Sequence, residues 1–157
     1  MDTPKEAPID RPMDALICID ACTLPIPYSY SKYLYFSSHL IGVSSCVSLY
    51  YQDYITFLFM FTLFMSSLRY WSKPDYGWVR NLDMFLCKCI AVYFYMNVLC
   101  YYDEYCRVVG FYCMLTNLFF YIVELILCSL KSNKWIIFHM FIHIHVSFFT
   151  PFILYIL

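Results

Sequence analysis

The sequence predicts an all-α protein, a polytopic membrane helix bundle with about five transmembrane helices. Hydrophobic residues make up 62% of the 157 residues and charged residues only 13%, with a mean hydropathy of +0.63. Soluble domains are about half apolar and about a quarter charged, so lipid is the expected solvent for most of this chain. Five apolar runs approach the roughly 20 residues that cross a bilayer, and a spanning backbone must satisfy its own hydrogen bonds, which favours helices.

Residues 1–27 differ from the rest of the chain. They are polar and contain five of the seven prolines, and they lack the basic region and apolar core of a signal peptide. Such a segment buries too little apolar surface to offset the entropy of ordering. We therefore divide the chain into a cytoplasmic tail, 1–27, and a membrane domain, 28–157.

The five apolar runs of the membrane domain give the expected spans. They lie near 33–50, 54–68, 82–101, 108–130 and 135–157. The first two are short and are joined only by the sequence YQDY, which predicts a tight helical hairpin.

The basic residues give an expected orientation. With five spans, eight of them fall in segments on one side of the membrane, and Arg107 alone falls on the other, while Lys88 lies within the third span. Basic residues favour the cytoplasmic side. We therefore expect a cytoplasmic N-terminus and a non-cytoplasmic C-terminus.

Polar side chains within the spans gather at one depth. With a rise of about 1.5 Å per residue, they all fall within roughly 12 Å of the cytoplasmic boundary. Polar groups confined to one leaflet indicate a water-accessible site there. The group consists of His39, Ser66, Ser67, Asp83, Lys88, Glu124, His139 and His143.

His139 and His143 form the sharpest motif. Their i, i+4 spacing puts both imidazoles on one helix face, where they can reach one metal ion or hydrogen-bond to neighbouring helices. Zinc generally takes at least three protein ligands, and the candidates for the third are Asp83, Glu124 and His39. His145 points elsewhere.

Structural roles compete with functional ones at each of these positions. Asp83 could stabilise a helix N-terminus or pair with Arg80, and Lys88 could reach the headgroups or pair with Glu124. Ser66 and Ser67 could hydrogen-bond to their own helix. His39 lies near a small-residue stripe suited to helix packing, formed by Ser38, Gly42 and Cys46. The nine cysteines lack metal-ligand spacing and are interpreted as structural.

Two segments carry a resemblance, FTLFMSSLRYWSKPDYGWVRNLDMF and WIIFHMFIHIH. Together they resemble small, mostly uncharacterised multipass membrane proteins of large DNA viruses and protists, and more distantly the CREST superfamily (alkaline ceramidases, Per1-like proteins, progestin and adiponectin receptors). The resemblance implies that His139 and His143 are zinc ligands, that Asp83 holds a zinc-bound water, and that Ser67 is a supporting polar group. The chain departs from the superfamily in having Arg69, Tyr70 and Trp71 where its second-helix histidine stands, and five spans rather than seven.

Three classes of function are consistent with these features. The first is a structural or interaction protein, with the bilayer and other membrane proteins as partners. The second is a metal-dependent membrane hydrolase of lipid amide or ester bonds, with zinc as cofactor and Asp83 and Ser67 as catalytic candidates. The third is a transporter or channel component, which the scarcity of ionisable residues in the outer half disfavours. The net charge of −1 gives no indication of a nucleic-acid partner.

Overall fold

The computed structural model describes residues 28–74, 77–101 and 103–155, and these residues form an all-α bundle without strands. The predicted fold class is confirmed. The predicted tail, 1–27, lies outside the described residues. The helices of the described part are α1 (Tyr28–Tyr50), α2 (Tyr54–Ser72), α3 (Trp78–Tyr101), α4 (Glu104–Ser129) and α5 (Trp135–Tyr155).

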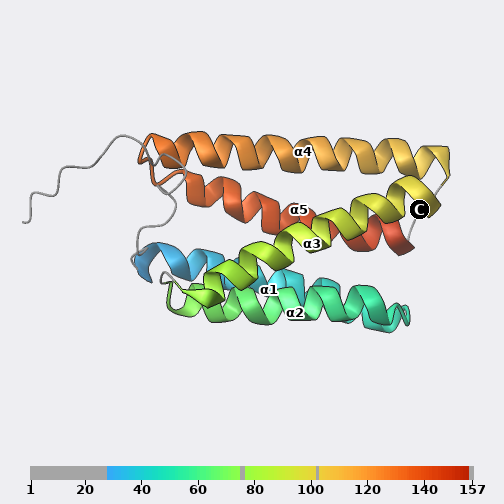
Figure 1. The fold of residues 1–157 in the computed structure, drawn as a ribbon, viewed down its shortest axis with the longest axis horizontal. Helices are drawn as coiled ribbons and strands as arrows, with labels where there is room; N and C mark the ends of the chain where they lie inside the picture. Colours follow the sequence, from blue (N-terminus) through green and yellow to red (C-terminus); the bar gives the residue numbers. More distant parts are fainter. Residues whose placement is uncertain (1–27, 75–76, 102, 156–157) are drawn as a thin grey trace, which may run out of the picture.

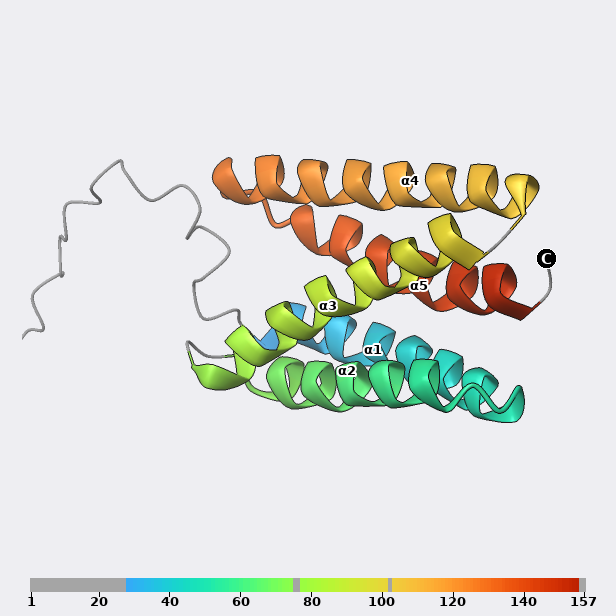
Figure 2. The ribbon, with the colours of Figure 1, turned by 45° about the vertical axis from the view of Figure 1, so that its right-hand side comes forward.

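The helices run alternately up and down along the long axis of the bundle (Figures 1 and 2). We call the end where α1, α3 and α5 begin the entry end, and the opposite end the far end. Helix α1 packs between α2 and α5, and α4 packs along α5. Helix α3 runs diagonally, close to α2 at the entry end and close to α4 at the far end (Figures 1 and 2).

Two aspartates define helix starts at the far end. Asp53 is the N-cap of α2, accepting a hydrogen bond of 3.0 Å from the backbone N–H of Thr56, and Asp103 caps α4 in the same way through Cys106 at 2.8 Å. A carboxylate at this position satisfies an N–H group that has no partner within the helix. The predicted hairpin at YQDY is present, and Gln52 makes its turn with a φ of 61°.

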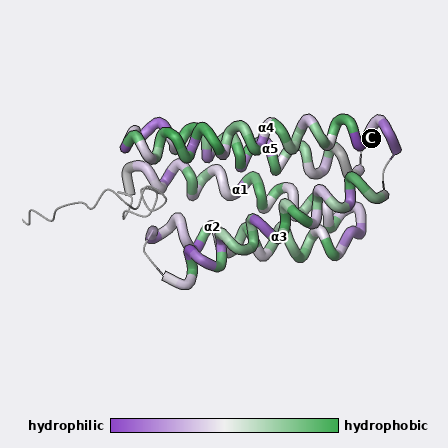
Figure 3. The backbone as a smooth tube through the Cα atoms, turned by 45° about the horizontal axis from the view of Figure 1, so that its top comes forward, coloured by the Kyte–Doolittle hydropathy of each residue, from purple (hydrophilic) through white to green (hydrophobic). Residues whose placement is uncertain are grey.

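Within the described residues, three helices are long and apolar enough to cross a membrane, by length and composition: α3 over Trp78–Cys100, α4 over Glu104–Ser129 and α5 over Trp135–Phe152. Helices α1 and α2 are not among them. Hydrophobic residues predominate along α4 and α5 in Figure 3. The protein is therefore an integral membrane protein by this criterion, and the crossing of α1 and α2 stays a prediction.

Several helix bounds differ from the expected spans. Helix α2 continues to Ser72, and α3 already begins at Trp78. Tyr70 and Trp71, which a hydropathy reading assigns to a connector, are buried in a cluster with Leu34 of α1 and Ile136 of α5. This packing extends α2 by a full turn, because aromatic side chains with polar ends can lie in an interior and still read as weakly hydrophobic.

Small residues allow two close helix contacts. The buried face of α1 is lined with serines, which let α2 and α5 approach it closely. The stripe expected through Ser38, Gly42 and Cys46 is wrong in part, since Ser38 is buried but Cys46 is exposed. The serines fully or almost fully buried on α1 are Ser31, Ser37, Ser38, Ser44, Ser45 and Ser48.

Candidate functional site: a polar layer

Asp83 of α3 is held by two serines of α2. The Oγ atoms of Ser66 and Ser67 both donate to Asp83 Oδ1, each at 2.7 Å, and all three side chains are buried. Ser66 Oγ also lies 2.9 Å from the Leu63 carbonyl of its own helix, so its single hydroxyl proton is shared. The hydroxyl proton of Ser67, by contrast, goes to Asp83 alone.

His139 of α5 pairs with Glu124 of α4. Its Nδ1 lies 2.9 Å from Glu124 Oε1, a contact that is a hydrogen bond when the imidazole is neutral and an ion pair when it is protonated. Because a carboxylate accepts and does not donate, Nδ1 of His139 carries the proton. The neutral imidazole then has its lone pair on Nε2.

His143 of α5 bonds to α1. Its Nδ1 lies 2.8 Å from Ser37 Oγ, and Ser37 Oγ also donates to the Leu34 carbonyl at 3.0 Å. Since the hydroxyl has one proton and gives it to Leu34, the bond to His143 is donated by Nδ1–H. His143 thus has the same tautomer as His139, with Nε2 unprotonated. The two rings are edge to face, with centroids 4.8 Å apart.

These contacts bring side chains from all five helices to one level near the entry end. We call this set the polar layer: Ser37, Ser66, Ser67, Asp83, Glu124, His139 and His143. Its two halves approach each other at His139, which lies near enough to Asp83 for an electrostatic interaction when the imidazole is protonated. The sequence-based expectation that Ser67, Asp83, Glu124, His139 and His143 share one depth agrees with this arrangement.

Two tryptophans surround His139. The ring of Trp71 lies edge to face with it at 5.3 Å between centroids, and that of Trp135 at 6.1 Å. Two buried polar atoms beside this histidine, the Nε1 of Trp71 and the Oε2 of Glu124, have no hydrogen-bond partner in the described residues. One is a donor and the other an acceptor, so Glu124 of the layer and the adjoining Trp71 retain unused hydrogen-bonding capacity.

Other candidates from the sequence do not join the layer. His39 is exposed, and its Nδ1 bonds to the Tyr35 carbonyl of its own helix at 3.1 Å. Lys88 is exposed as well. The alternative pairs Arg80–Asp83 and Lys88–Glu124 do not form, because serines hold Asp83 and His139 holds Glu124. Asp83 is also the sixth residue of α3 rather than its start.

His145 is buried away from this site. It packs against Phe149 and Phe120, with ring centroids 4.2 Å and 6.3 Å away. This agrees with the expectation that it points elsewhere than His143.

The layer does not contain a complete metal site. Within residues 28–74, 77–101 and 103–155, no three side chains of His, Cys, Asp or Glu lie close enough together to hold a metal ion. His139 and His143 supply two bare Nε2 atoms, but none of the three candidates for a third ligand joins them. Glu124 instead orients His139 through Nδ1, the atom that a metal-binding histidine commonly gives to a carboxylate.

Sequence reasoning missed Ser37 and Trp71. Ser37 could have been found from the spacing of serines on α1, where Ser37 and Ser44, like Ser31 and Ser38, are seven residues apart and share a face. Nothing in the sequence indicated that Trp71 would lie against His139.

Comparisons with known proteins add no relative. No protein-family model matches the chain, and no curated protein or solved structure matches it either.

Proposed function

We propose that this protein is a multipass membrane protein with a structural or interaction role, in which the polar layer joins the helices into one unit. The observation that carries the proposal is that the buried ionisable groups of the layer are matched across helices. Asp83 is bound by α2, His139 by α4 and His143 by α1. Polar side chains that satisfy one another in this way stabilise helix association in a bilayer.

The proposed topology has five membrane crossings, with the N-terminus cytoplasmic and the C-terminus on the opposite side. The alternating helices support this, because the entry end then collects the basic residues of the α2–α3 and α4–α5 connections. A reporter fused after Leu157 should be non-cytoplasmic, and one inserted at Gln52 should be on the same side. If the two reporters lie on opposite sides, α1 and α2 do not both cross.

A metal-dependent hydrolase of lipid amide or ester bonds is the second candidate, and the histidine tautomers favour it. Both Nδ1 atoms are occupied by hydrogen bonds, so both Nε2 lone pairs are free for another partner. In this role His139 and His143 would bind zinc, and Asp83, oriented by Ser67, would be the catalytic carboxylate. The missing third ligand among the described residues ranks this candidate behind the structural one.

Zinc content distinguishes the two candidates. Protein purified in detergent without chelators should contain no stoichiometric zinc if the layer is structural. Stoichiometric zinc that is lost in both His139→Ala and His143→Ala, and kept in His145→Ala, would favour the hydrolase. His145 is the matched control because it is a buried histidine of the same helix outside the layer.

A further inference from the structure

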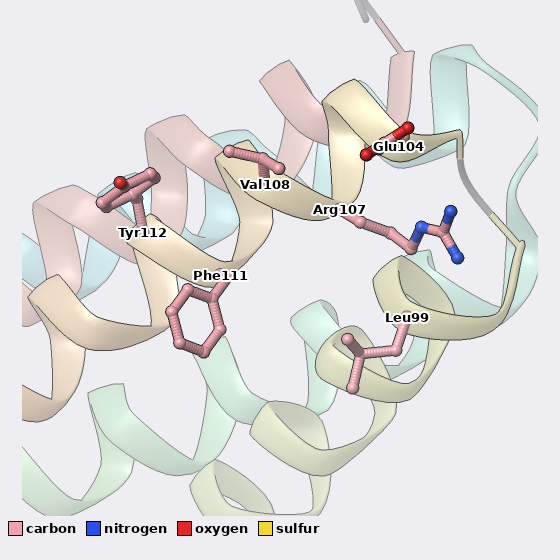
Figure 4. Close-up of a pocket in the computed structure, with 6 residues that line it drawn as sticks. All are labelled: Leu99, Glu104, Arg107, Val108, Phe111 and Tyr112. Carbon is pink, nitrogen blue, oxygen red and sulfur yellow. The ribbon is translucent and has the colours of Figure 1, made fainter.

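A shallow depression lies between α3 and α4 at the far end of the bundle. It has a volume of about 480 Å³ and is lined by Leu99, Glu104, Arg107, Val108, Phe111 and Tyr112. Figure 4 shows the side chain of Arg107 extending from α4 past Leu99, which is near the end of α3. The ring of Phe111 projects from the lower side of α4 in the same view. This volume falls in the range that small ligands occupy in proteins.

The two charges of the depression do not neutralise each other. Glu104 and Arg107 are one helical turn apart, a spacing that allows a salt bridge. Yet Glu104 and Arg107 form no salt bridge in the described part of the chain, where the contact of this kind is that of Glu124 with His139. Arg107 also interacts electrostatically with Asp103, whose carboxylate is already engaged by the N–H of Cys106. Both exposed charges are thus free to meet a ligand.

Charge and hydrophobicity are graded with depth. Glu104 opens α4 at the end of the membrane-crossing segment, and Phe111 lies seven residues further along it, about 10 Å deeper. Glu104, Arg107 and Leu99, which is two residues from the end of α3, therefore line the outer part of the depression, and Val108, Phe111 and Tyr112 line the inner part. This gradient matches that of a lipid, which has a charged headgroup above an apolar chain.

We propose that the depression binds a glycerophospholipid whose headgroup carries a primary ammonium, as in phosphatidylethanolamine. Arg107 binds the phosphate, and Glu104 accepts a hydrogen bond from the ammonium. The first carbons of one acyl chain lie against Leu99 and Phe111. The opposite charges of the headgroup are adjacent, as are those of the protein, so both are matched at once. This site is independent of the role of the polar layer.

The chemistry predicts an order of lipid preference. A trimethylated ammonium, as in phosphatidylcholine, has no N–H to donate to Glu104. Phosphatidylglycerol keeps the phosphate but has no cation. Hydrogen bonds between charged groups are strong enough that losing one, or replacing the ammonium donor with a neutral hydroxyl, should weaken binding about tenfold.

Native mass spectrometry of the detergent-solubilised full chain, titrated with each of the three lipids, tests the site. Wild type should bind phosphatidylethanolamine about tenfold more tightly than the other two. Glu104→Leu, which has no hydrogen-bond acceptor, should abolish this preference, and Arg107→Gln should weaken the binding of all three lipids. Lys134→Gln, which removes an exposed cation at the entry end, should change neither the affinity for the three lipids nor the preference among them.

Further measurements test whether the variants act by unfolding the protein and whether free phosphate is the ligand. Circular dichroism should show unchanged helicity in the Glu104 and Arg107 variants. Inorganic phosphate should not displace the lipid, because it lacks the acyl chain. Equal binding of the three lipids by wild type, or a preference that survives Glu104→Leu, would overturn the proposal.

Discussion

Ser67 Oγ donates a hydrogen bond of 2.7 Å to Asp83 Oδ1, and this contact joins α2 to α3 inside the helix bundle. Ser66 reaches the same oxygen atom at the same distance. The carboxylate is thus held by two donors from one helix, of which one is shared with a backbone carbonyl and the other is not.

This redundancy predicts non-additive substitutions. Ser67→Ala should lower the free energy of unfolding by about 0.6 kcal/mol, the average for an interhelical hydrogen bond in membranes, and Ser66→Ala by less. The double variant leaves Asp83 Oδ1 buried without a donor and should cost about 1–3 kcal/mol more than the sum. Reversible unfolding in mixed micelles measures all three. Strict additivity would mean that the carboxylate finds another donor.

The pairing of His139 with Glu124 should appear as a coupling energy between α4 and α5. A double-mutant cycle with His139→Ala and Glu124→Ala should give a positive coupling of about 0.6–1.7 kcal/mol, the range seen for such contacts in bilayers. The matched control pairs Glu124→Ala with Lys88→Ala. Because Lys88 is exposed and unpaired with Glu124, that cycle should give no coupling. Coupling in the control cycle alone would contradict the described pairing.

Gly110 closes the contact between α3 and α4. A Cβ at this position would collide with the side chain of Val98, which is β-branched and cannot rotate away easily. Gly110→Ala should therefore destabilise the protein by about 1–3 kcal/mol, as overpacking typically does. Adding Val98→Ala should restore most of the loss.

Gly42 provides a comparison for this prediction. A Cβ there would lie 3.1 Å from the tip of the Phe64 ring, which can shift by a few tenths of an ångström. Gly42→Ala should thus cost less than Gly110→Ala. The opposite order in thermal unfolding would show that the close approach of α3 and α4 is not rigid.

Acidification should loosen the start of α4. The hydrogen bond from the backbone N–H of Cys106 lowers the pKa of Asp103 below its ordinary value of about 3.9. The folded state therefore favours the ionised carboxylate. Its stabilising effect is complete above the ordinary pKa and is lost as the pH falls through the lowered one.

An NMR titration of Asp103 checks this pKa directly, and hydrogen exchange at Cys106 reports the cap. Exchange at this amide should accelerate as the pH falls below about 3.9, after correction for the intrinsic rate. In Asp103→Asn, whose amide oxygen caps without titrating, the corrected rate should be independent of pH. A titration of Asp103 at or above its ordinary pKa would contradict the N-cap.

Hydropathy and helical rise explain why much of this arrangement was predictable. Apolar runs located the helices, and counting residues from one boundary put Ser67, Asp83, Glu124, His139 and His143 at one depth. Depth says nothing about the direction in which a side chain points around its helix. The exposure of His39 and the choice of His139 rather than Lys88 as the partner of Glu124 depend on helix rotation, which the packing of neighbouring helices decides.

The predicted end of α2 was wrong for a related reason. Tyr70 and Trp71 carry polar atoms and follow Arg69, so hydropathy alone assigned them to a connector. Their burial against Leu34 and Ile136 depends on two helices that are distant in sequence. The hydropathy of a short stretch of sequence cannot predict such tertiary contacts.

The bond between Ser37 and His143 has a consequence for how the chain assembles during synthesis. The two residues are 106 positions apart, on the first and last helices of the described bundle. A ribosome therefore releases α1 long before its partner exists, and in that interval Ser37 can bond to the Leu34 carbonyl of its own helix. Completion of the polar layer must wait for the final segment, so a chain truncated before α5 would leave α1 and α4 without their histidine partners.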